Sequence, residues 1–435
     1  MKLKLVTVAL GLAASTAVFA ASSDSAQLNN LQQQLQRLQS QVAAMQAGKG
    51  GSTSTAGLGA YVGTDSALTW DMMSNYSAQG REMSILEARK SGHLGNHAVY
   101  FGGFAKTDAM WQISNNKGVF RNAAFHGING KNGTAIQLTG LNLLTTATLN
   151  QWTTLFLQLG GSNVGASNGD EHVGFQQAYM LFGDLNKMPV YGFIGDKDVD
   201  FGHFGSVNLY SQPLNRMLFA AYGDQAGVGY SAYGANVVAT LINGGTNGNN
   251  LYTKRGASMD NFAIDASYGG NYKNTDWKVG AGYLNGASAE WARSNDQTNG
   301  AWDLNGQLSV MNFDVLAEYT QTTSNTAVSG SKSNVQSWNV GLAYNFMFMG
   351  RNSKVSASYS AARLAFLGQS HQNTYSQYVV GVRNELLPNV WGGFEYAYND
   401  DVIAAVGTNH YSQMLYGKNN KANNNTLLLD LTAAF

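Results

Sequence analysis

From residue 99 to the carboxyl terminus, apolar and polar side chains alternate in successive segments of about ten residues. A period of two is typical of β-strands whose two faces meet different surroundings. We predict sixteen strands, at residues 99–112, 134–147, 152–161, 172–183, 189–197, 226–233, 235–243, 260–270, 275–285, 301–310, 312–322, 335–345, 354–363, 374–384, 390–399 and 425–435. The pattern therefore predicts an all-β fold over most of the chain.

Five of these segments gather large apolar side chains on one face. These faces are Phe262/Ile264/Ala266/Tyr268, Trp277/Val279/Ala281/Tyr283, Phe313/Val315/Ala317/Tyr319, Trp338/Val340/Leu342/Tyr344 and Phe394/Tyr396/Tyr398. Aromatic residues recur at the strand ends, which is the arrangement of aromatic belts at membrane interfaces. We interpret these faces as lipid-facing.

The last strand predicts the fold most directly. Phe435, Ala433, Leu431, Leu429 and Leu427 fall on one face, and Leu428 is the only apolar exception on the other. An alternating strand that ends on an aromatic residue is typical of the closing strand of a bacterial outer-membrane β-barrel. Phe435 would then be the signal that the barrel assembly machinery recognises. The alternative is a half-buried strand of a soluble β-protein, which the amino terminus disfavours.

Connection lengths agree with a barrel. Short turns (148–151, 184–188, 234, 271–274, 311, 346–353 and 385–389) alternate with longer loops (113–133, 162–171, 198–225, 244–259, 286–300, 323–334, 364–373 and 400–424). We place the short set in the periplasm and the long set outside. A one-residue turn at Gly234 is too tight, so fourteen or eighteen strands stay open.

Four zones precede or form the barrel. Residues 1–20 read as a secretory signal peptide, with Lys2 and Lys4 before an apolar stretch. Residues 21–47 predict a periplasmic coiled coil, with a heptad seam of Leu28, Leu31, Leu35, Leu38, Val42 and Met45. The third zone, residues 48–98, is a Gly/Ser/Thr linker (48–60) followed by an unassigned segment (61–98). That segment is either a periplasmic segment or a plug at the barrel base. Residues 99–435 are the predicted outer-membrane barrel.

Composition narrows the function classes. Charged residues make up only 12% of the chain and cysteine is absent, so disulfides and thiolate sites are excluded. Without Lys2 and Lys4 the chain has 24 basic against 26 acidic side chains, which disfavours nucleic acid as a partner. We find no catalytic, phosphate-binding or dinucleotide-binding motif, so we predict no enzyme activity, no cofactor and no metal site. Asp196, Asp198 and Asp200 lack the spacing of a calcium loop and fit a solvated loop rim.

The predicted lumen carries charges of both signs. Alternation directs ten charged side chains inward, and we take them as pore-lining candidates: Lys106, Asp108, Asp265, Lys278, Asp303, Asp314, Glu318, Arg383, Glu395 and Asp430. Sixteen strands enclose an aqueous channel, whereas eight are filled by side chains. The sequence therefore predicts a polar conduit without specifying its cargo.

The 198–225 loop is the longest external connection. It combines apolar and glycine residues with Asp198, Asp200, His203, Tyr210 and Arg216, our candidates for a pore constriction. An ordinary exposed loop is the alternative. Five histidines (His126, His172, His203, His371 and His410) fall on predicted external loops, and four tyrosines (Tyr252, Tyr375, Tyr411 and Tyr416) could act with them. They suit either a metal chelate or a plain polar surface.

The arrangement resembles the LbtU-type siderophore porins. The shared features are the signal, the Gln-rich coiled coil, the linker and the barrel, together with the segment Phe182-Gly-Asp-Leu-Asn-Lys-Met-Pro-Val-Tyr-Gly-Phe-Ile-Gly195 and Asp200-Phe-Gly-His-Phe204. The resemblance implies uptake of a ferric siderophore through a barrel without a globular plug. It supplies no ligand residues.

We therefore expect an outer-membrane porin with outer-membrane lipids, the barrel assembly machinery and a small-molecule ligand as partners. Two alternatives stay open. One is a porin for small organic solutes, a homo-oligomer joined by the coiled coil. The other is a structural or adhesive surface barrel whose pore is incidental.

Overall fold

The structure is a computed structural model of the whole chain. It describes residues 61–64, 81–114, 132–162, 172–243, 259, 261–287, 299–323, 326–328, 331–364, 373–400 and 423–435. The chain divides into two units, 1–61 and 62–435, and the account below concerns the second. The predicted signal, coiled coil and linker lie outside the described residues, as do His126, His371, His410, Tyr252, Tyr411 and Tyr416.

Strands dominate the described part of the chain. Sixteen long strands are β2 (Ala98–Ser114), β3 (Asn132–Thr148), β4 (Thr153–Ser162), β5 (His172–Gly183), β6 (Val190–Asp198), β7 (Tyr222–Ala232), β8 (Ala235–Ile242), β9 (Asn261–Tyr272), β10 (Thr275–Leu284), β11 (Ala301–Val310), β12 (Phe313–Thr322), β15 (Gln336–Phe348), β16 (Arg351–Leu364), β17 (Asn373–Leu387), β18 (Val390–Asp400) and β19 (Asn423–Ala434). The short elements are β1 (Tyr61–Thr64), α4 (Arg81–Lys90), α5 (Leu214–Phe219), β13 (Thr326–Val328) and β14 (Ser331–Ser333). No helix in these ranges has the length and apolar content needed to cross a membrane.

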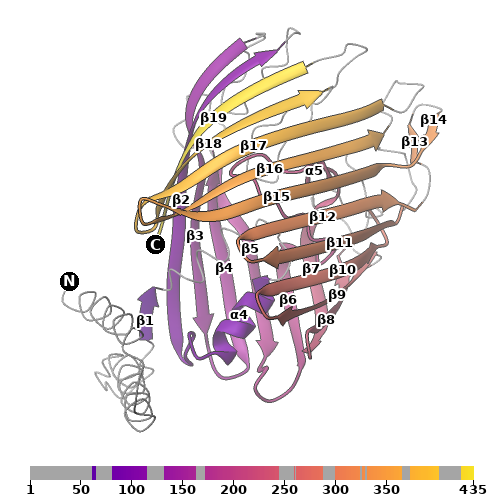
Figure 1. Cartoon of the computed structure of the whole chain (residues 1–435). Coiled ribbons are helices and arrows are strands. Elements are labelled where there is room, and N and C mark those ends of the chain that lie inside the picture. The colour runs from indigo at the N-terminus through magenta and orange to yellow at the C-terminus, as the bar shows by residue number, and fades with distance from the viewer. Residues whose placement is uncertain are drawn as a thin grey trace, which may run out of the picture. The chain divides into compact units, whose positions relative to one another are not determined.

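The sixteen long strands close into an antiparallel barrel. Each pairs with its neighbours in sequence, β13 and β14 form a separate hairpin between β12 and β15, and β19 pairs with β2 (Figure 1). All sixteen predicted strands are present, and several extend a few residues beyond the predicted limits. The predicted fold class and the count of sixteen are confirmed.

Tight turns join the strands at one end. Five connections have only two residues, and a residue with positive φ stands in each: Tyr233, Lys273, Met311, Met349 and Asn389. In the β7–β8 turn both Tyr233 (φ 54°) and Gly234 (φ 82°) adopt this conformation, as a hairpin turn that matches the strand twist requires. The predicted one-residue turn at Gly234 is wrong, because Tyr233 belongs to the turn. The predicted turn at 346–353 is likewise only residues 349–350.

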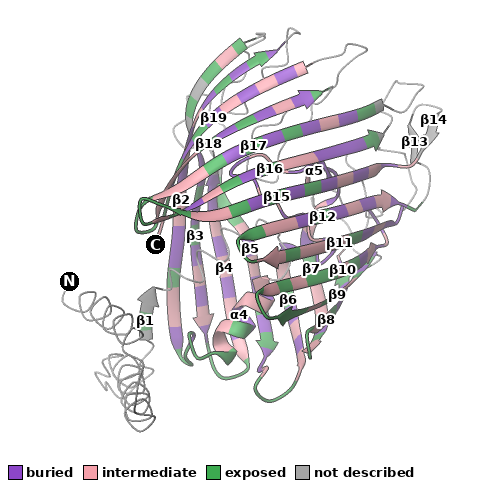
Figure 2. Ribbon diagram, viewed as in Figure 1, coloured by how far each residue is buried: buried purple, intermediate pink, exposed green. Residues whose placement is uncertain are grey.

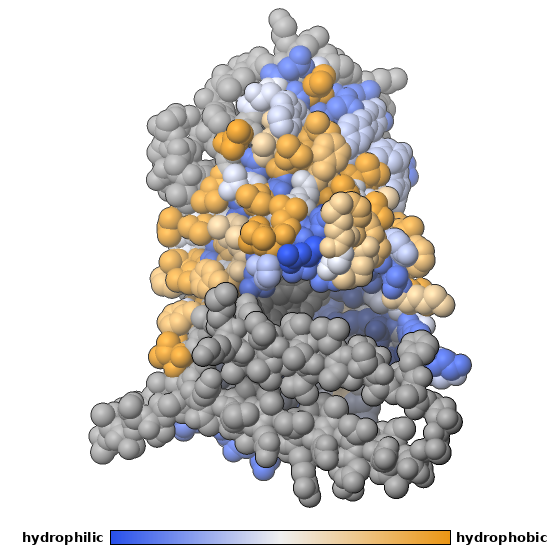
Figure 3. All heavy atoms as spheres, turned by 60° about the vertical axis from the view of Figure 1, so that its left-hand side comes forward, coloured by the Kyte–Doolittle hydropathy of each residue, from blue (hydrophilic) through white to orange (hydrophobic). Residues whose placement is uncertain are grey.

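The two faces of the wall differ as predicted. Along most strands, more buried positions alternate with less buried ones (Figure 2). Ile264, Val279, Val340 and Leu342 are all about half exposed on the outside. On the side of the barrel shown in Figure 3, apolar side chains, coloured orange, gather on the outer face of the strands. The outer surface thus offers a broad apolar area that a lipid bilayer would cover.

Aromatic side chains meet across neighbouring strands at two levels of this outer surface. Near the tight turns, Tyr268 packs against Trp277 with ring centroids 5.5 Å apart. Near the long connections, Trp302 and Tyr319 are 5.2 Å apart. Such pairs stabilise adjacent strands, and their two levels fit the aromatic belts of a membrane-spanning barrel.

Phe435 completes the closure between the first and last long strands. Its backbone N–H donates to the Gly103 carbonyl at 2.9 Å, and its own carbonyl accepts from Gly103 N–H at 3.1 Å. A side chain at Gly103 would collide with the Phe435 ring, because a Cβ there would lie 2.8 Å from it. Glycine at 103 therefore makes room for the terminal aromatic side chain.

Candidate functional site

Two segments pack against the inner face of the barrel wall. One is the helix α4. The other is residues 199–221, the connection between β6 and β7, called here the lumen loop, which contains α5. Both contact side chains that point inward from the strands. The strand register determines which side chains point inward, because residues two apart on a strand face the same side.

The helix α4 is bound by apolar contacts. Ile85 and Leu86 are completely buried against Phe156, Tyr179 and Tyr191, which come from β4, β5 and β6. The helix ends at Lys90 and is followed by a turn in which Gly92 (φ 80°) donates its N–H to the Arg89 carbonyl. Arg89 also donates to Thr154 Oγ1 at 2.7 Å and to the Asn150 carbonyl at 2.6 Å. The helix therefore packs against the inner face of β4, β5 and β6.

A buried lysine joins α4 to the lumen loop. Lys197 Nζ on β6 lies 3.2 Å from Glu82 of α4 and 2.8 Å from Asp200 of the loop, and all three side chains are almost fully buried. Burial, and after it the neighbouring Glu82 carboxylate, raises the pKa of Asp200. Removing one partner from a buried ion pair is strongly destabilising, so this triad fixes helix and loop to the same wall strand.

Wall carboxylates hold the lumen loop by its backbone. Glu318 of β12 accepts hydrogen bonds from the N–H groups of His203 and Phe204, at 2.6 and 2.8 Å, and one from the Asn215 amide. Glu395 of β18 accepts from three consecutive N–H groups, those of Leu209, Tyr210 and Ser211, at 2.9 to 3.0 Å. Hydrogen bonds to a charged acceptor are the stronger kind.

A cation and an apolar cluster complete the attachment. Lys106 Nζ donates to the Leu209 carbonyl at 2.8 Å and lies 3.2 Å from Asp430. The helix α5 buries Leu214, Leu218 and Phe219 among inward-facing residues of the wall. The loop therefore crosses from β6 to the far strands and packs there, instead of projecting into solvent.

Four of the five constriction candidates lie in this loop, and Asp198 is the last residue of β6. Asp198 and Asp200 are both buried, and Tyr210 is buried beneath Lys106, whose Nζ lies 4.9 Å from the ring centre. Arg216 is half-buried on α5. Desolvation by the packed loop, and after it the Lys278 charge, lowers the pKa of His203 to about 3, so its imidazole is neutral at physiological pH.

All ten pore-lining candidates lie on inward-facing positions, but they differ in exposure. Six are buried, by the lumen loop or by one another: Lys106, Asp108, Asp303, Glu318, Glu395 and Asp430. Lys278 is exposed, and Asp265, Asp314 and Arg383 are half-buried. Most of the acidic groups thus bind protein donors, and the cations Lys278 and Arg383 remain more accessible.

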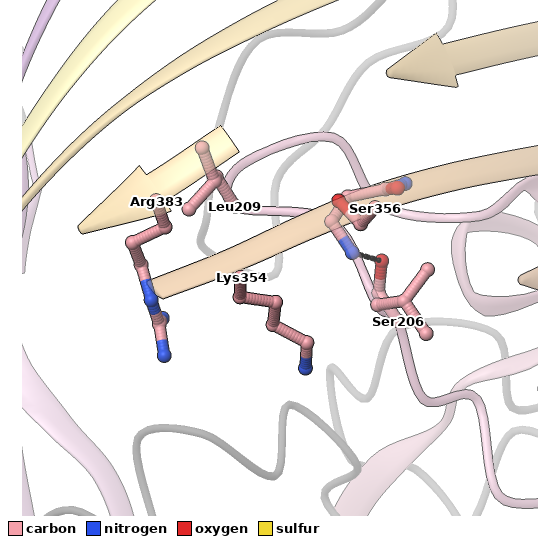
Figure 4. A pocket seen from close by; sticks show the side chains of 7 residues that line it. Ser206, Leu209, Lys354, Ser356 and Arg383 are labelled. Carbon is pink, nitrogen blue, oxygen red and sulfur yellow. Dashed lines mark hydrogen bonds between the residues drawn. The ribbon is translucent and has the colours of Figure 1, made fainter. Parts of the chain in front are cut away.

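A small pocket lies beside the tip of the lumen loop. Residues 206–209 face Lys354 and Ser356 of β16 and Arg383 of β17 across a cavity of about 40 Å³. Figure 4 shows the Lys354 and Arg383 side chains extending from the wall into the same open space. Sequence reasoning missed Lys354. The outward residues Val355, Ala357 and Tyr359 of the same strand imply its inward position.

Three members of the predicted chelate surface, Tyr375, His172 and His203, lie within the described residues. Tyr375 is buried on the inner face of β17 within the α5 cluster. His172 begins β5, and His203 lies in the lumen loop. Among the described residues, no three His, Cys, Asp or Glu side chains are placed to hold a metal ion.

No family model and no curated protein matches this sequence. Solved structures do. An anion-selective porin from Comamonas acidovorans is 11% identical with a TM-score of 0.55, covering 78% of this chain and 99% of that one. The outer membrane channel DcaP of Acinetobacter baumannii is 12% identical with a TM-score of 0.52, covering 78% and 97%. The chain has a porin fold.

A third solved structure has the same fold. OmpF of Salmonella typhi, solved with daunomycin, is 12% identical with a TM-score of 0.51 and covers 78% of this chain and 97% of that one. At such low identity the likeness establishes the barrel fold and no more. These comparisons do not assign the chain to the LbtU-type siderophore porins.

Proposed function

We propose that the chain is an outer-membrane porin, a channel through which small polar solutes diffuse, rather than an enzyme. The observation that carries this is the closed barrel of sixteen strands with an apolar outside and a polar inside. A barrel of this size encloses space for water. Its apolar outer surface has no other ready partner than lipid.

In this proposal the lumen loop and α4 set the size of the passage. Both fill part of the barrel interior that would otherwise hold water. The wall carboxylates and the Lys197 triad hold them in place. The pocket that Lys354 and Arg383 line beside the loop tip would then open onto this passage.

Single-channel recording in planar bilayers tests the proposal. The parent protein should form stable, water-filled channels, and deletion of residues 203–216 should raise the conductance because it removes the loop from the lumen. Deleting the fourteen residues 402–415 from the β18–β19 connection is a control of equal length. A parent without conductance would contradict the channel and favour a structural or adhesive barrel.

Uptake of a ferric siderophore is the more specific proposal, and the resemblance to LbtU-type porins supports it. The shared segment covers the β5–β6 turn, most of β6 and the root of the lumen loop, including Asp200. These residues shape the passage, so a common passage would explain a common segment. A strain lacking the protein should grow poorly when a ferric siderophore is its iron source. Equal growth would contradict siderophore uptake and leave the channel intact.

We further propose that the seam at residues 28–45 joins copies of the chain in the periplasm. About six apolar side chains per helix, each worth about 1.5–3 kcal/mol when buried, suffice to associate helices but not to hold a barrel. Leu31→Asp with Leu38→Asp should give a folded, heat-resistant monomer by light scattering. Loss of the folded barrel would contradict a separate role for the seam.

A further inference from the structure

Two cationic side chains stand side by side on neighbouring strands of the inner wall. Lys354 of β16 is directly opposite Arg383 of β17 in the antiparallel register, and both point inward beside the loop tip (Figure 4). Like charges placed directly opposite destabilise a sheet. The wall therefore keeps two cations together at a cost that a bound anion would offset.

The protein groups around these cations leave positive charge facing the pocket. Asp314 Oδ2 lies 3.8 Å from Lys354 Nζ, but the same carboxylate accepts shorter hydrogen bonds of 2.7 Å from Ser309 and Asn345. The Arg383 guanidinium lies 4.7 Å from the Trp391 ring centre. Glu385, two residues further along β17, accepts from the Asn352 amide.

Acidic groups on the loop side of the pocket are already bound. The carboxylate of Glu395 accepts three backbone N–H groups of the loop and is buried. Ser206 and Ser356 also line the pocket. The Ser206 hydroxyl donates to the Ser211 carbonyl at 3.3 Å and accepts from the Asn208 N–H at 3.0 Å. The pocket thus combines serine hydroxyls with two cations, and such cations recognise a carboxylate or phosphate oxygen.

We propose that Lys354 and Arg383, with Ser206 and Ser356, form a transient binding site for small oxyanions at the narrow part of the lumen. This inference rests on the proposed channel function and names its preferred solutes. A site that binds weakly speeds entry without preventing release, as conduction requires. Small organic acids and inorganic phosphate share the oxygen chemistry that this site recognises.

The test measures anion preference in bilayers under a KCl gradient, with phosphate and acetate as probes. Lys354→Gln combined with Arg383→Gln should lower the chloride-to-potassium permeability ratio about fivefold, the effect of a nearby unit charge in water. It should also abolish the reduction of chloride current by either probe. Asp314→Asn removes the counter-charge and should change the ratio in the opposite direction.

A matched control is Lys273→Gln, which removes a cation from the β9–β10 turn, where Lys273 lies over the Tyr272 ring. It should leave the ratio unchanged. Folded double-mutant channels with the parent's permeability ratio and probe response would overturn the site while leaving the porin intact. If the parent does not conduct, the channel proposal fails, and calorimetric titration of phosphate into the detergent-solubilised barrel decides the site: binding lost in the double mutant supports it, and equal or absent binding overturns it.

Discussion

A single carboxylate can organise several residues of a loop, and Glu395 is the clearest case. Its two oxygens accept the N–H groups of Leu209, Tyr210 and Ser211, and the side chain is almost fully buried. A backbone N–H that loses its partner inside a protein costs about 1–3 kcal/mol. The acceptor at 395 therefore matters more for the position of the loop than for the charge of the passage.

We predict that Glu395→Ala lowers the unfolding free energy by about 3 kcal/mol or more, because three N–H groups lose their acceptor. The loop tip should also loosen and single-channel conductance should rise. The unfolding temperature of the heat-modifiable band in detergent measures the first effect. Glu385→Ala is the control, since that carboxylate accepts only a side-chain amide from Asn352. Equal loss in both variants would contradict a special role for Glu395.

Residue-level prediction from the sequence succeeded for direction and failed for exposure. Alternation placed all ten charged candidates on the inner face, because the face to which a side chain points depends only on its position along the strand. Whether a loop later covers Asp265 or Glu318 depends on contacts distant in sequence, which no local pattern contains. Leu428 was a visible clue. This apolar exception on the inner face of β19 is buried with Met110, Leu209 and Tyr210, at the place where the loop packs.

At the scale of elements, the strands were predictable and α4 was not. A strand between lipid and water repeats every two residues, and the whole barrel repeats this pattern. The helix α4 has only ten residues and buries Glu82 together with Ile85 and Leu86, so its buried face includes a charge. Its partner Lys197 lies on another strand. A mixed buried face of this kind carries no clear helical period.

We predict that Ile85→Asp with Leu86→Asp releases α4 from the wall, because two carboxylates would otherwise be buried beside Phe156 and Tyr179. The barrel should remain folded, since its strand pairings are unaffected. Single-channel conductance should rise as the helix leaves the lumen. Protease cleavage within residues 81–90 reports the release. Lys90→Asp, at an exposed helix position, should change neither. A released helix with unchanged conductance would show that α4 does not narrow the passage.

At the scale of the whole molecule, closure is the property that the sequence conveyed best. The pattern of β19 identified its two faces and its terminal aromatic residue. An even number of strands also makes β2 and β19 run in opposite directions, so that they can pair as antiparallel neighbours. The pairing of β19 with β2 from Asn424 to Ala434 confirms this. Because every strand edge is then paired, the barrel exposes no open edge to another chain.

The last residue should matter for closing the barrel more than for its final stability. Phe435 adds two backbone hydrogen bonds to Gly103 at the end of a ladder that already runs from Asn424 to Ala434. Two terminal hydrogen bonds contribute only about 1–3 kcal/mol, which is small beside sixteen strand pairings. We predict that deletion of Phe435 lowers outer-membrane yield and leaves unfolded protein in the periplasm. The fraction that does fold should unfold at nearly the parent's temperature. Phe435→Tyr keeps both the backbone pair and an aromatic ring over Gly103, so its yield should match the parent. A normal yield of the deletion variant would show that assembly does not depend on Phe435, and a large fall in the unfolding temperature would show that its role lies in the folded barrel.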